Sequence, residues 1–362
     1  MAYAYLEAAQ LAGYELNPDF NGARQNGVGL YNFTQKDGQR VTAEGAYLDP
    51  VRQRPNLNVI PDTQVTKIMF EGSTATGVAW KRGAETGVIA GREIILAAGA
   101  FVSPQLLMLS GVGKARELAK HGIPLVQDLP GVGENLQDHL DVTLEYRAKS
   151  TAPYGLSWKA LPRNVLHVLD WIFRKRGLFS STTGEGGGFI STDPASDRPD
   201  IQLFFCTGRA NTQAASGFTG HGFLMHICQL RPGSIGCVAL KSADPDERPS
   251  IRLARRIMAQ KPLEPHLDAE IDPGPDVVSD GALDAFIRQC AGTLFHPVGT
   301  CAMGQGPEAV VDPQTLRVHG TSGLRVVDAS IMPTIVSANT VAATYCLAEK
   351  GADLIKRDCR AT

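Results

Sequence analysis

The sequence has neither a long apolar run nor an excess of basic residues. Its longest strongly apolar run, residues 94–102, is far too short to cross the hydrocarbon core of a bilayer, so we expect no transmembrane segment. Thirty-five Lys and Arg stand against thirty-seven Asp and Glu, which gives a formal net charge of −2. Because no basic excess attracts polyanions, neither nucleic acid nor an anionic lipid surface is an expected partner.

Cysteine is scarce and follows no pattern. The seven cysteines lie at positions 206, 228, 237, 290, 301, 346 and 359, and no C-x-x-C pair occurs. An odd count in a chain of this length argues against a disulfide scaffold and favours a reducing compartment. The first ten residues, MAYAYLEAAQ, contain no basic stretch and include Glu7, so we expect no secretory signal. These observations predict a cytoplasmic location.

Periodicity and turn residues predict a mixture of helices and strands. Helical spacing occurs in residues 2–12 and 158–176, whereas the Gly-, Asn- and Asp-rich residues 17–38 predict a loop. The run IILAAGA at 94–100 predicts a strand buried on both faces, followed by a helix with Ser103 as its N-cap and Pro104 as its first residue. A hairpin is expected for 58–70 and 77–81, and an antiparallel sheet for 200–205, 221–230 and 236–242.

The last seventy residues combine groups that suit redox chemistry. His296 lies in a Phe-His-Pro-Val-Gly turn, where Pro297 biases it towards an extended backbone. Residues 324–327 predict a buried strand that ends at Asp328, and Asn339 opens a helix from about Thr340 to Lys356. A strand, a loop and a helix N-terminus in this order place ligands at the carboxyl edge of an α/β sheet.

The start of that helix offers N–H groups and a partial positive charge to an anion. The negative edge of a reduced flavin would suit this position. A neutral imidazole at His296 can take a hydroxyl proton while the amide of Asn339 holds the same oxygen. The pattern therefore indicates a site at which a histidine and an amide act on one hydroxyl group.

Four motifs carry a resemblance to a known family. They are LAAGAFVSPQLLMLSGVG at 96–113, PGVGENLQDHL at 130–140, FHPVGTCAMG at 295–304 and VVDASIMPTIVSAN at 326–339. Together they resemble the glucose–methanol–choline (GMC) family of FAD-dependent oxidoreductases, and most of all its choline- and alcohol-dehydrogenase branch. The similarity extends from about Asn17 to Lys356.

The resemblance implies an enzyme with FAD as cofactor that oxidises a small primary alcohol to the aldehyde. It implies that His296 removes the hydroxyl proton, that hydride passes to flavin N5 and that Asn339 orients the oxygen. The electron acceptor, quinone or oxygen, is left open. No metal ligand is implied, and the residues expected to contact FAD are Val65, Asn135, Asp328, Ala329 and Thr340.

The implied fold is α/β, with an incomplete Rossmann-like FAD-binding domain made of residues 1–140 and 290–362. Residues 141–289 would form a substrate-binding domain with an antiparallel sheet. Members of the family begin with a strand, a G-x-G-x-x-G turn and a helix that bind the ADP half of FAD, and no such fingerprint occurs in this sequence. We therefore expect a truncated member, and the alternative to an active enzyme is an inactive remnant that does not retain FAD.

Several of these residues can also be explained by a purely structural role. Asn339 can be only a helix cap, Asp328 only a loop cap, and Val65 only strand core. Glu185 could face a cationic substrate, although an exposed loop carboxylate is the simpler interpretation.

Two other kinds of site find less support in the sequence. His221, His226 and Cys228 suggest a metal site, but their spacing fits no zinc pattern. Ser330 with His296 and Asp328 supplies the residue types of a hydrolase triad. The sequence has no G-x-S-x-G elbow to present the serine, so this alternative is set aside.

Overall fold

The computed structural model describes residues 1–193, 195–196, 198–208, 220–246, 250–252, 270–272, 279, 281–282 and 291–361. The chain forms two compact units, each assembled from separate stretches of sequence. Unit 1 consists of Met1–Val59, Leu140–Leu230 and the described part of Met258–Leu294. Unit 2 consists of Ile60–His139 and the described parts of Arg231–Ile257 and Phe295–Thr362. The assignment of residues 1–140 and 290–362 to flavin and of 141–289 to substrate stays a prediction.

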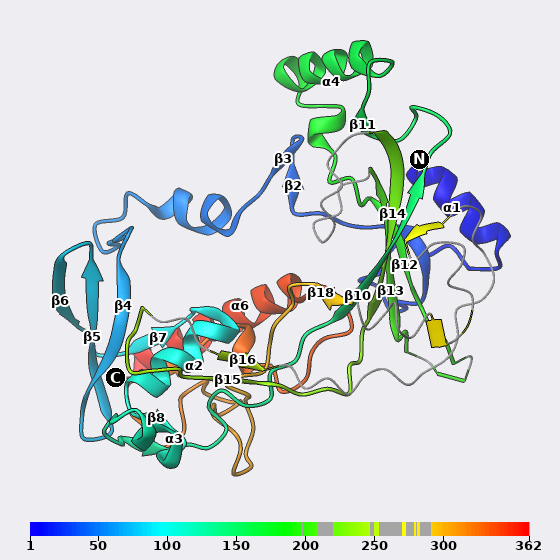
Figure 1. The fold of residues 1–362 in the computed structure, drawn as a ribbon. Helices are drawn as coiled ribbons and strands as arrows, with labels where there is room; N and C mark the ends of the chain where they lie inside the picture. Colours follow the sequence, from blue (N-terminus) through cyan, green and yellow to red (C-terminus); the bar gives the residue numbers. More distant parts are fainter. Residues whose placement is uncertain are drawn as a thin grey trace. The chain divides into compact units, whose positions relative to one another are not determined.

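Unit 1 is built on an antiparallel sheet that has eight strands among the described residues (Figure 1). The strand order is β1-β12-β13-β14-β10-β17, with β11 paired to β14 and β18 paired to β10. The strands are β1 (Gly27–Leu30), β10 (Leu140–Arg147), β11 (Gly155–Leu156), β12 (Gly186–Ile190), β13 (Ile201–Thr207), β14 (Gly220–Gln229), β17 (Glu270–Asp272) and β18 (Gly292–Thr293).

Strand β1 corrects the prediction of a loop over residues 17–38. Its glycine-rich sequence pairs with the glycine-rich β12, Val28 lying opposite Gly188 and Gly29 opposite Gly187. The glycines make room for an aromatic side chain, because a Cβ on Gly187 would lie 2.3 Å from the ring of Tyr31. The hydroxyl of Tyr31 donates to the carbonyl of Leu203 on the next strand, at 2.6 Å. The glycines that led to the prediction of a loop are therefore needed for close packing between strands and the ring of Tyr31.

The remaining elements of unit 1 include two helices at the predicted places. α1 (Ala2–Leu11) packs Leu6 and Ala9 against Val28 of β1, and α4 (Leu161–Arg174) falls within the predicted residues 158–176. The strands expected at 200–205 and 221–230 are confirmed as β13 and β14. Shorter elements are β2 (Gln35–Lys36), β3 (Gln39–Arg40), η1 (Glu44–Leu48), η2 (Asp49–Val51) and η3 (Leu178–Ser180).

Unit 2 contains an antiparallel sheet of three strands, β4 (Gln64–Glu71), β5 (Thr74–Arg82) and β6 (Glu85–Ala90). β4 and β5 confirm the predicted hairpin. A parallel pair is formed by β7 (Ile94–Leu96) and β19 (Leu324–Val326). The prediction that β7 is buried on both faces is wrong, because Leu96 faces the core whereas the side chain of Ile95 is 42% exposed.

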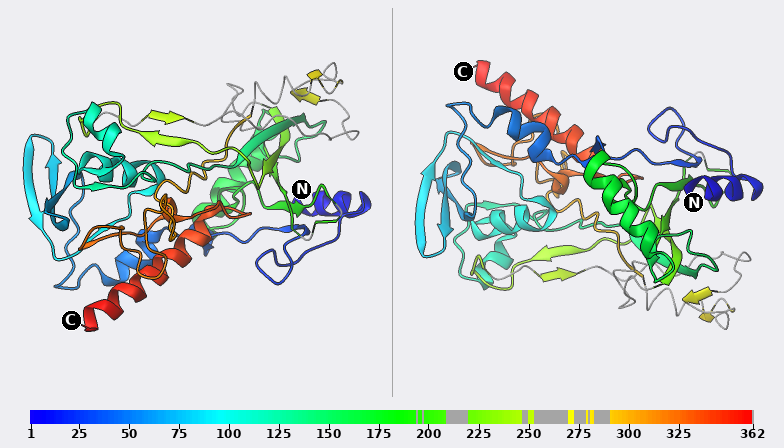
Figure 2. Two further views of the ribbon diagram at one scale, coloured as in Figure 1. Left: turned by 90° about the horizontal axis from the view of Figure 1, so that it is seen from below. Right: turned by 90° about the horizontal axis from the view of Figure 1, so that it is seen from above.

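The remaining elements of unit 2 cover these strands. The segment at 236–242, predicted to join the antiparallel sheet of unit 1, instead forms β15 in unit 2, where it pairs with β16. The glycine turns of the 130–140 motif hold it there, because the carbonyl of Gly133 accepts from the N–H of Val238. The elements are α2 (Gly99–Leu109), β8 (Val112–Gly113), α3 (Ala115–Lys120), β9 (Gln127–Asp128), β15 (Cys237–Ala239), β16 (Ser250–Arg252), η4 (Ala329–Ile331) and α6 (Thr340–Ala361), which Figure 2 shows as one uninterrupted helix.

Helix α2 begins five residues earlier than the sequence predicts, at Gly99 instead of Pro104. Ser103 and Pro104 lie inside the helix, and the carboxylate of Asp328 accepts from the N–H of Gly99 at the helix start, at 2.9 Å. Pro104 has no N–H to donate to a carbonyl one turn earlier. The carbonyl of Ala100, four residues before it, accepts from the hydroxyl of Thr300 at 2.6 Å. Asp328 and Thr300, both distant in the sequence, therefore supply the helix cap and the donor that the residues around Pro104 do not provide.

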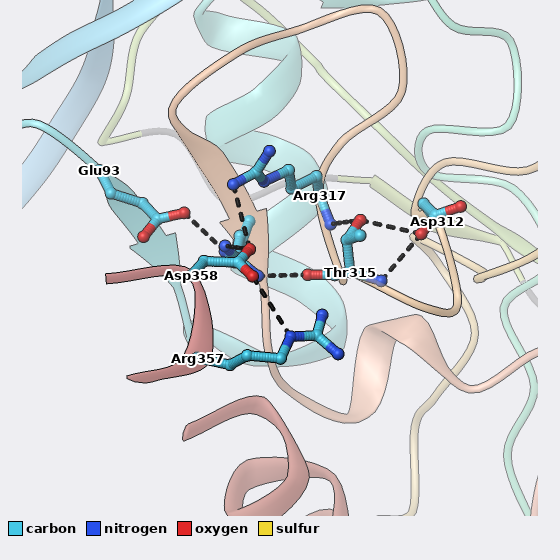
Figure 3. A network of polar contacts seen from close by, with 7 residues as sticks. Glu93, Asp312, Thr315, Arg317, Arg357 and Asp358 are labelled. Atoms are coloured by element: carbon cyan, nitrogen blue, oxygen red, sulfur yellow. Dashed lines mark hydrogen bonds and ion pairs between the residues drawn. The ribbon is translucent and has the colours of Figure 1, made fainter. Parts of the chain in front are cut away.

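A buried arginine, Arg325, fixes β19 in the core of unit 2, and Figure 3 labels its partners Glu93, Thr315 and Asp358. The side chain of Arg325 is fully buried, and its guanidinium donates to Glu93 at 2.6 Å, to Asp358 at 2.6 Å and to the carbonyl of Thr315. Arg325 thereby joins β19 to the segment before β7 and to the last turns of α6. The hydrogen bond to Arg325 lowers the pKa of Asp358. No helix in the described part of the chain is long and apolar enough to cross a membrane.

Candidate active site

The histidine turn at 295–299 pairs with the 130–140 motif inside unit 2. The N–H of Val298 donates to the carbonyl of Gln137 at 2.9 Å, and the reverse bond from Gln137 measures 3.1 Å. The carboxylate of Asp138 accepts from the N–H of His296 at 2.9 Å. Pro297 permits the extended backbone that this pairing requires. Two motifs whose residues Asp138 and His296 are 158 positions apart thus form one short ladder that fixes the backbone of His296.

Both ring nitrogens of His296 are engaged. Its Nδ1 lies 3.0 Å from Nδ1 of His139, and its Nε2 lies 3.2 Å from the amide nitrogen of Asn339. The rings of His139 and His296 meet edge to face, with their centroids 5.2 Å apart. His139 and His296 are both buried, whereas Asn339 is exposed. The structure therefore brings together the two residues that the sequence proposes for catalysis, and it adds His139.

These contacts define a protonation pattern. An amide nitrogen can only donate, so Nε2 of His296 accepts from Asn339 and carries its lone pair on that side. The proton of a neutral imidazole then sits on Nδ1, from which it is donated to His139. The basic nitrogen of His296, Nε2, consequently faces the exposed Asn339, and the opposite nitrogen, Nδ1, is held by His139.

Two amide side chains of the 130–140 motif hold the loop that precedes Asn339. Asn135, at a φ of 61°, donates to the carbonyls of Gly299 at 3.3 Å and Pro333 at 3.1 Å. Gln137 donates to Pro333 at 3.2 Å and accepts from the N–H of Ile335 at 3.1 Å. Asn135, predicted as a cofactor contact, therefore ties the histidine turn to the loop that leads to α6.

Asp328 and Ala329 connect neighbouring segments of the site through hydrogen bonds. The buried carboxylate of Asp328 accepts from Ser103 at 2.6 Å and from the N–H and hydroxyl of Ser330 at 2.8 and 2.5 Å, besides capping α2. The carbonyl of Ala329 accepts from the N–H of Gly299 at 3.3 Å. Ser330 is fully buried and bonded to Asp328, so its hydroxyl is not presented as a nucleophile for the hydrolase alternative.

The other two predicted cofactor contacts lie in different places. Thr340 is the first residue of α6, directly after Asn339, and is buried. Val65 lies on β4, where it pairs with Trp80 and packs against the main hydrophobic cluster of unit 2. Thr340 thus belongs to the neighbourhood of His296, whereas Val65 shows the strand-core packing that was its simpler interpretation.

His226, one of the three residues considered for a metal site, forms an ion pair with Asp141. Nδ1 of His226 lies 2.7 Å from the carboxylate of Asp141, and the thiol of Cys228 donates to the same carboxylate at 3.3 Å. Burial alone would lower the pKa of His226, but its bonds to Asp141 and Cys206 outweigh burial and raise the pKa to about 10. Among the described residues, no group of three or more His, Cys, Asp or Glu side chains could hold a metal ion.

The surroundings of the His296–Asn339 pair fit a flavin. Phe295, which precedes His296, and Val341, in the first turn of α6, have apolar side chains that are 76% and 54% exposed. Exposed apolar side chains can pack against a flat aromatic ring. The first turn of α6 adds partial positive charge next to Asn339, where the negative edge of a reduced ring would be stabilised.

Comparison with known proteins decides the family. Sequence models of GMC oxidoreductases match residues 1–141 and 248–348. An alcohol dehydrogenase [acceptor] of Pseudomonas putida is 42% identical over 378 residues, covering 99% of this chain and 68% of that protein. The chain belongs to the GMC oxidoreductase family.

Further relatives agree with this assignment. The mitochondrial choline dehydrogenase of Homo sapiens is 42% identical over 375 residues, which cover 98% of this chain and 63% of that enzyme. A solved structure of formate oxidase from Aspergillus oryzae, described through its FAD modification, has a TM-score of 0.87 at 26% identity. That match covers 99% of this chain and 70% of the other. The predicted family, the α/β fold class and FAD as the cofactor of the family are confirmed.

Sequence reasoning missed the place of His139. The motif at 130–140 contains His139 without indicating a role for it, whereas in the structure its ring lies against the ring of His296. The spacing of the motif could have indicated this place. Gln137 and His139 are two residues apart, so in an extended segment their side chains extend from the same side. What the sequence could not show was that this segment pairs with Val298.

Proposed function

We propose that the protein is an FAD-dependent oxidoreductase that oxidises a primary alcohol to the aldehyde. The observation that carries the proposal is the 3.2 Å contact between Nε2 of His296 and the amide of Asn339 at the start of α6. The imidazole of His296 can accept the proton of a hydroxyl group while the amide of Asn339 donates a hydrogen bond to the oxygen of the same group. The similarity to alcohol and choline dehydrogenases supports the same chemistry.

In this mechanism the substrate hydroxyl takes the place between His296 and Asn339. Nε2 of His296 accepts the hydroxyl proton, and the amide N–H of Asn339 turns from the imidazole to the alcohol oxygen. As the imidazole becomes positively charged, its Nδ1–H donates more strongly to His139. Bound FAD would supply the hydride acceptor at its N5.

The predicted cofactor contacts take separate roles in this proposal. Asn135 and Ala329 hold the histidine turn and its neighbouring loop beside the ring. Asp328 acts through the backbone that it orders, because its carboxylate already accepts four hydrogen bonds. The helix start at Thr340 stabilises negative charge on the reduced ring. Contact between Val65 and the adenine stays a prediction.

The inactive remnant is not the favoured alternative. The chain matches its enzyme relatives over nearly all of its own length, and the proposed catalytic pair is in contact. The choice among choline-like, aliphatic and aryl alcohols, the choice between quinone and oxygen as acceptor, and the cytoplasmic location stay predictions.

The test begins with the visible spectrum of the purified protein. We expect flavin bands close to stoichiometric with protein, and alcohol-dependent reduction of a quinone analogue or of oxygen across a panel of choline, aliphatic and aryl alcohols. Replacement His296→Gln should lower turnover by a factor of about 10² to 10⁴, the usual contribution of a general base. A colourless protein, or a folded and flavin-loaded protein without activity on any alcohol, would refute the proposal.

A matched control separates chemistry from folding. His121→Gln changes a histidine of unit 2 that lies at the C-terminal end of α3. We expect wild-type flavin content and turnover for this variant. Asn339→Ala should retain flavin and lose turnover by a factor of about 10² or more, because one preorganised donor to the oxygen is removed.

A further inference from the structure

Helix α4 (Leu161–Arg174) turns its apolar side away from unit 1. None of its residues is buried. At the helical repeat of about 100° per residue, its apolar side chains fall on one half of the helix. These are also its exposed side chains, with Leu166 at 65% and Phe173 at 79%. The exposed apolar surface comprises Trp158, Leu161, Val165, Leu166, Val168, Leu169, Ile172, Phe173 and Phe179, and is called the α4 surface below.

The polar side of α4 is the side that faces the protein. Arg163 donates to the carbonyl of Thr151 at 2.5 Å, and the amide of Asn164 donates to the carbonyl of Gly155 at 3.1 Å. His167 and Asp170 lie on the same side and are half-buried. A surface helix of a soluble protein normally has the opposite arrangement, with its apolar stripe inward. These hydrogen bonds hold α4 in this orientation, so its apolar side is exposed in the folded protein.

Basic residues surround the α4 surface. Residues 158–176 contain five Lys or Arg and a single acidic residue, Asp170, which forms an ion pair with Arg174 at 3.5 Å. The tip of the β2–β3 hairpin, at Gly38, touches the backbone of Lys175 at the end of the helix and brings Lys36 and Arg40 together with one acid, Asp37. The formal net charge of −2 for the whole chain hides this local excess. The basic residues of these two segments are Lys36, Arg40, Lys159, Arg163, Arg174, Lys175 and Arg176, of which Arg163 faces the protein.

We propose that the α4 surface is seated in the headgroup region of an anionic phospholipid bilayer. A helix with one broad apolar side rich in Trp, Phe and Leu and with basic residues at its edge is typical of helices that lie in a membrane interface. Fourteen residues are too few to span a bilayer, so the helix lies on the membrane.

The charge pattern selects the lipid surface over a second copy of the chain. In a symmetric dimer through this surface, the basic edges of the two copies would face each other, and like charges across an interface oppose association. An anionic leaflet attracts the same residues. The expectation from overall composition that anionic lipid is not a partner is therefore reversed for this one helix. The resulting attachment is peripheral and reversible by salt.

The proposal is tested by flotation of the purified, flavin-loaded protein with vesicles. Vesicles of phosphatidylcholine with about a third phosphatidylglycerol are compared with vesicles of phosphatidylcholine alone. We expect binding to the anionic vesicles that weakens at high salt, and much weaker binding to the neutral ones. The pair Lys159→Gln and Arg176→Gln, which removes two exposed charges, should weaken partitioning roughly fivefold for each charge removed. The pair Leu166→Glu and Phe173→Glu should abolish binding, with flavin content and turnover in solution unchanged.

Matched controls lie elsewhere in the chain. Leu11→Glu changes a leucine of α1 that is 85% exposed, and Lys350→Gln with Lys356→Gln removes two exposed charges from α6. Both controls should bind vesicles like the wild type. Absence of binding by folded protein, or equal binding to neutral vesicles, overturns the proposal. A wild-type dimer that Leu166→Glu converts to a monomer, without vesicle binding, would instead identify a contact between copies.

Discussion

Replacement of Asp328 by alanine should destabilise unit 2 through the loss of one buried acceptor. The carboxylate accepts from Gly99, from Ser103 and twice from Ser330, at 2.5 to 2.9 Å, and the residue is 6% exposed. A hydrogen bond to a charged group contributes about 1.5–3 kcal/mol, and a buried donor left unsatisfied costs about 1–3 kcal/mol. Two of the four donors are backbone N–H groups that cannot turn away. We therefore expect Asp328→Ala to lower the free energy of unfolding by about 3–5 kcal/mol.

Asparagine at position 328 gives an intermediate result. Its oxygen can still accept from Ser330, but its NH₂ group would face the N–H of Gly99, donor against donor. We expect a loss of about 2 kcal/mol. Asp312→Ala is the matched control, because Asp312 accepts from Gln314 and twice from Thr315 but lies nearer the surface, so its loss should be smaller.

Urea-induced unfolding followed by tryptophan fluorescence measures both effects. Trp80 lies on β5 of unit 2, whereas Trp158 and Trp171 lie in unit 1. In a background in which Trp158 and Trp171 are phenylalanine, the signal reports unit 2 alone. A loss below about 1 kcal/mol for Asp328→Ala, or a loss equal to that of Asp312→Ala, would refute the reasoning that a buried acceptor joins α2 to η4.

Three further perturbations test other parts of the structure. Arg325→Met should lower the free energy of unfolding of unit 2 by about 3 kcal/mol in the same urea assay, since it leaves two acidic partners without their cation, and a neutral result would contradict the network. The raised pKa of His226 means that the stability gained from Asp141 is fully present below pH 6.5 and is lost as the pH rises to about 10. Urea titrations from pH 6 to 10 should therefore show the deficit of Asp141→Asn shrinking with pH, and a constant deficit would count against the ion pair. Gly299→Ala should impair turnover, because φ is +93° and the new Cβ would lie 2.4 Å from the carbonyl of Asn135; unchanged kinetics would show that this turn is not needed.

Local pattern was enough to predict several elements of the fold. Helices α1 and α4 and the β4–β5 hairpin follow from helical or alternating spacing, together with a turn at Gly72, where φ is +60°. These elements depend on neighbours a few residues away. The motifs around His296 and Asn339 also placed both residues in one unit.

Contacts between distant segments explain what the sequence did not predict. The start of α2 depends on Asp328, 229 residues away, so the local signal of Ser103 and Pro104 was misleading. The pairing that puts His139 against His296 joins residues 157 positions apart. The inward polar side of α4 is also invisible to periodicity, because a helical repeat shows that a helix is amphipathic but not which side faces the protein.

The most direct test of the proposed chemistry is the rate of flavin reduction by alcohol in a single anaerobic turnover. Bleaching of the visible flavin bands after mixing with substrate is followed in the wild type and in His296→Ala at equal flavin content. We predict a reduction rate for the variant that is lower by a factor of about 10² to 10⁴. A variant that reduces its flavin at the wild-type rate would contradict the assignment of His296 as the base that acts with Asn339.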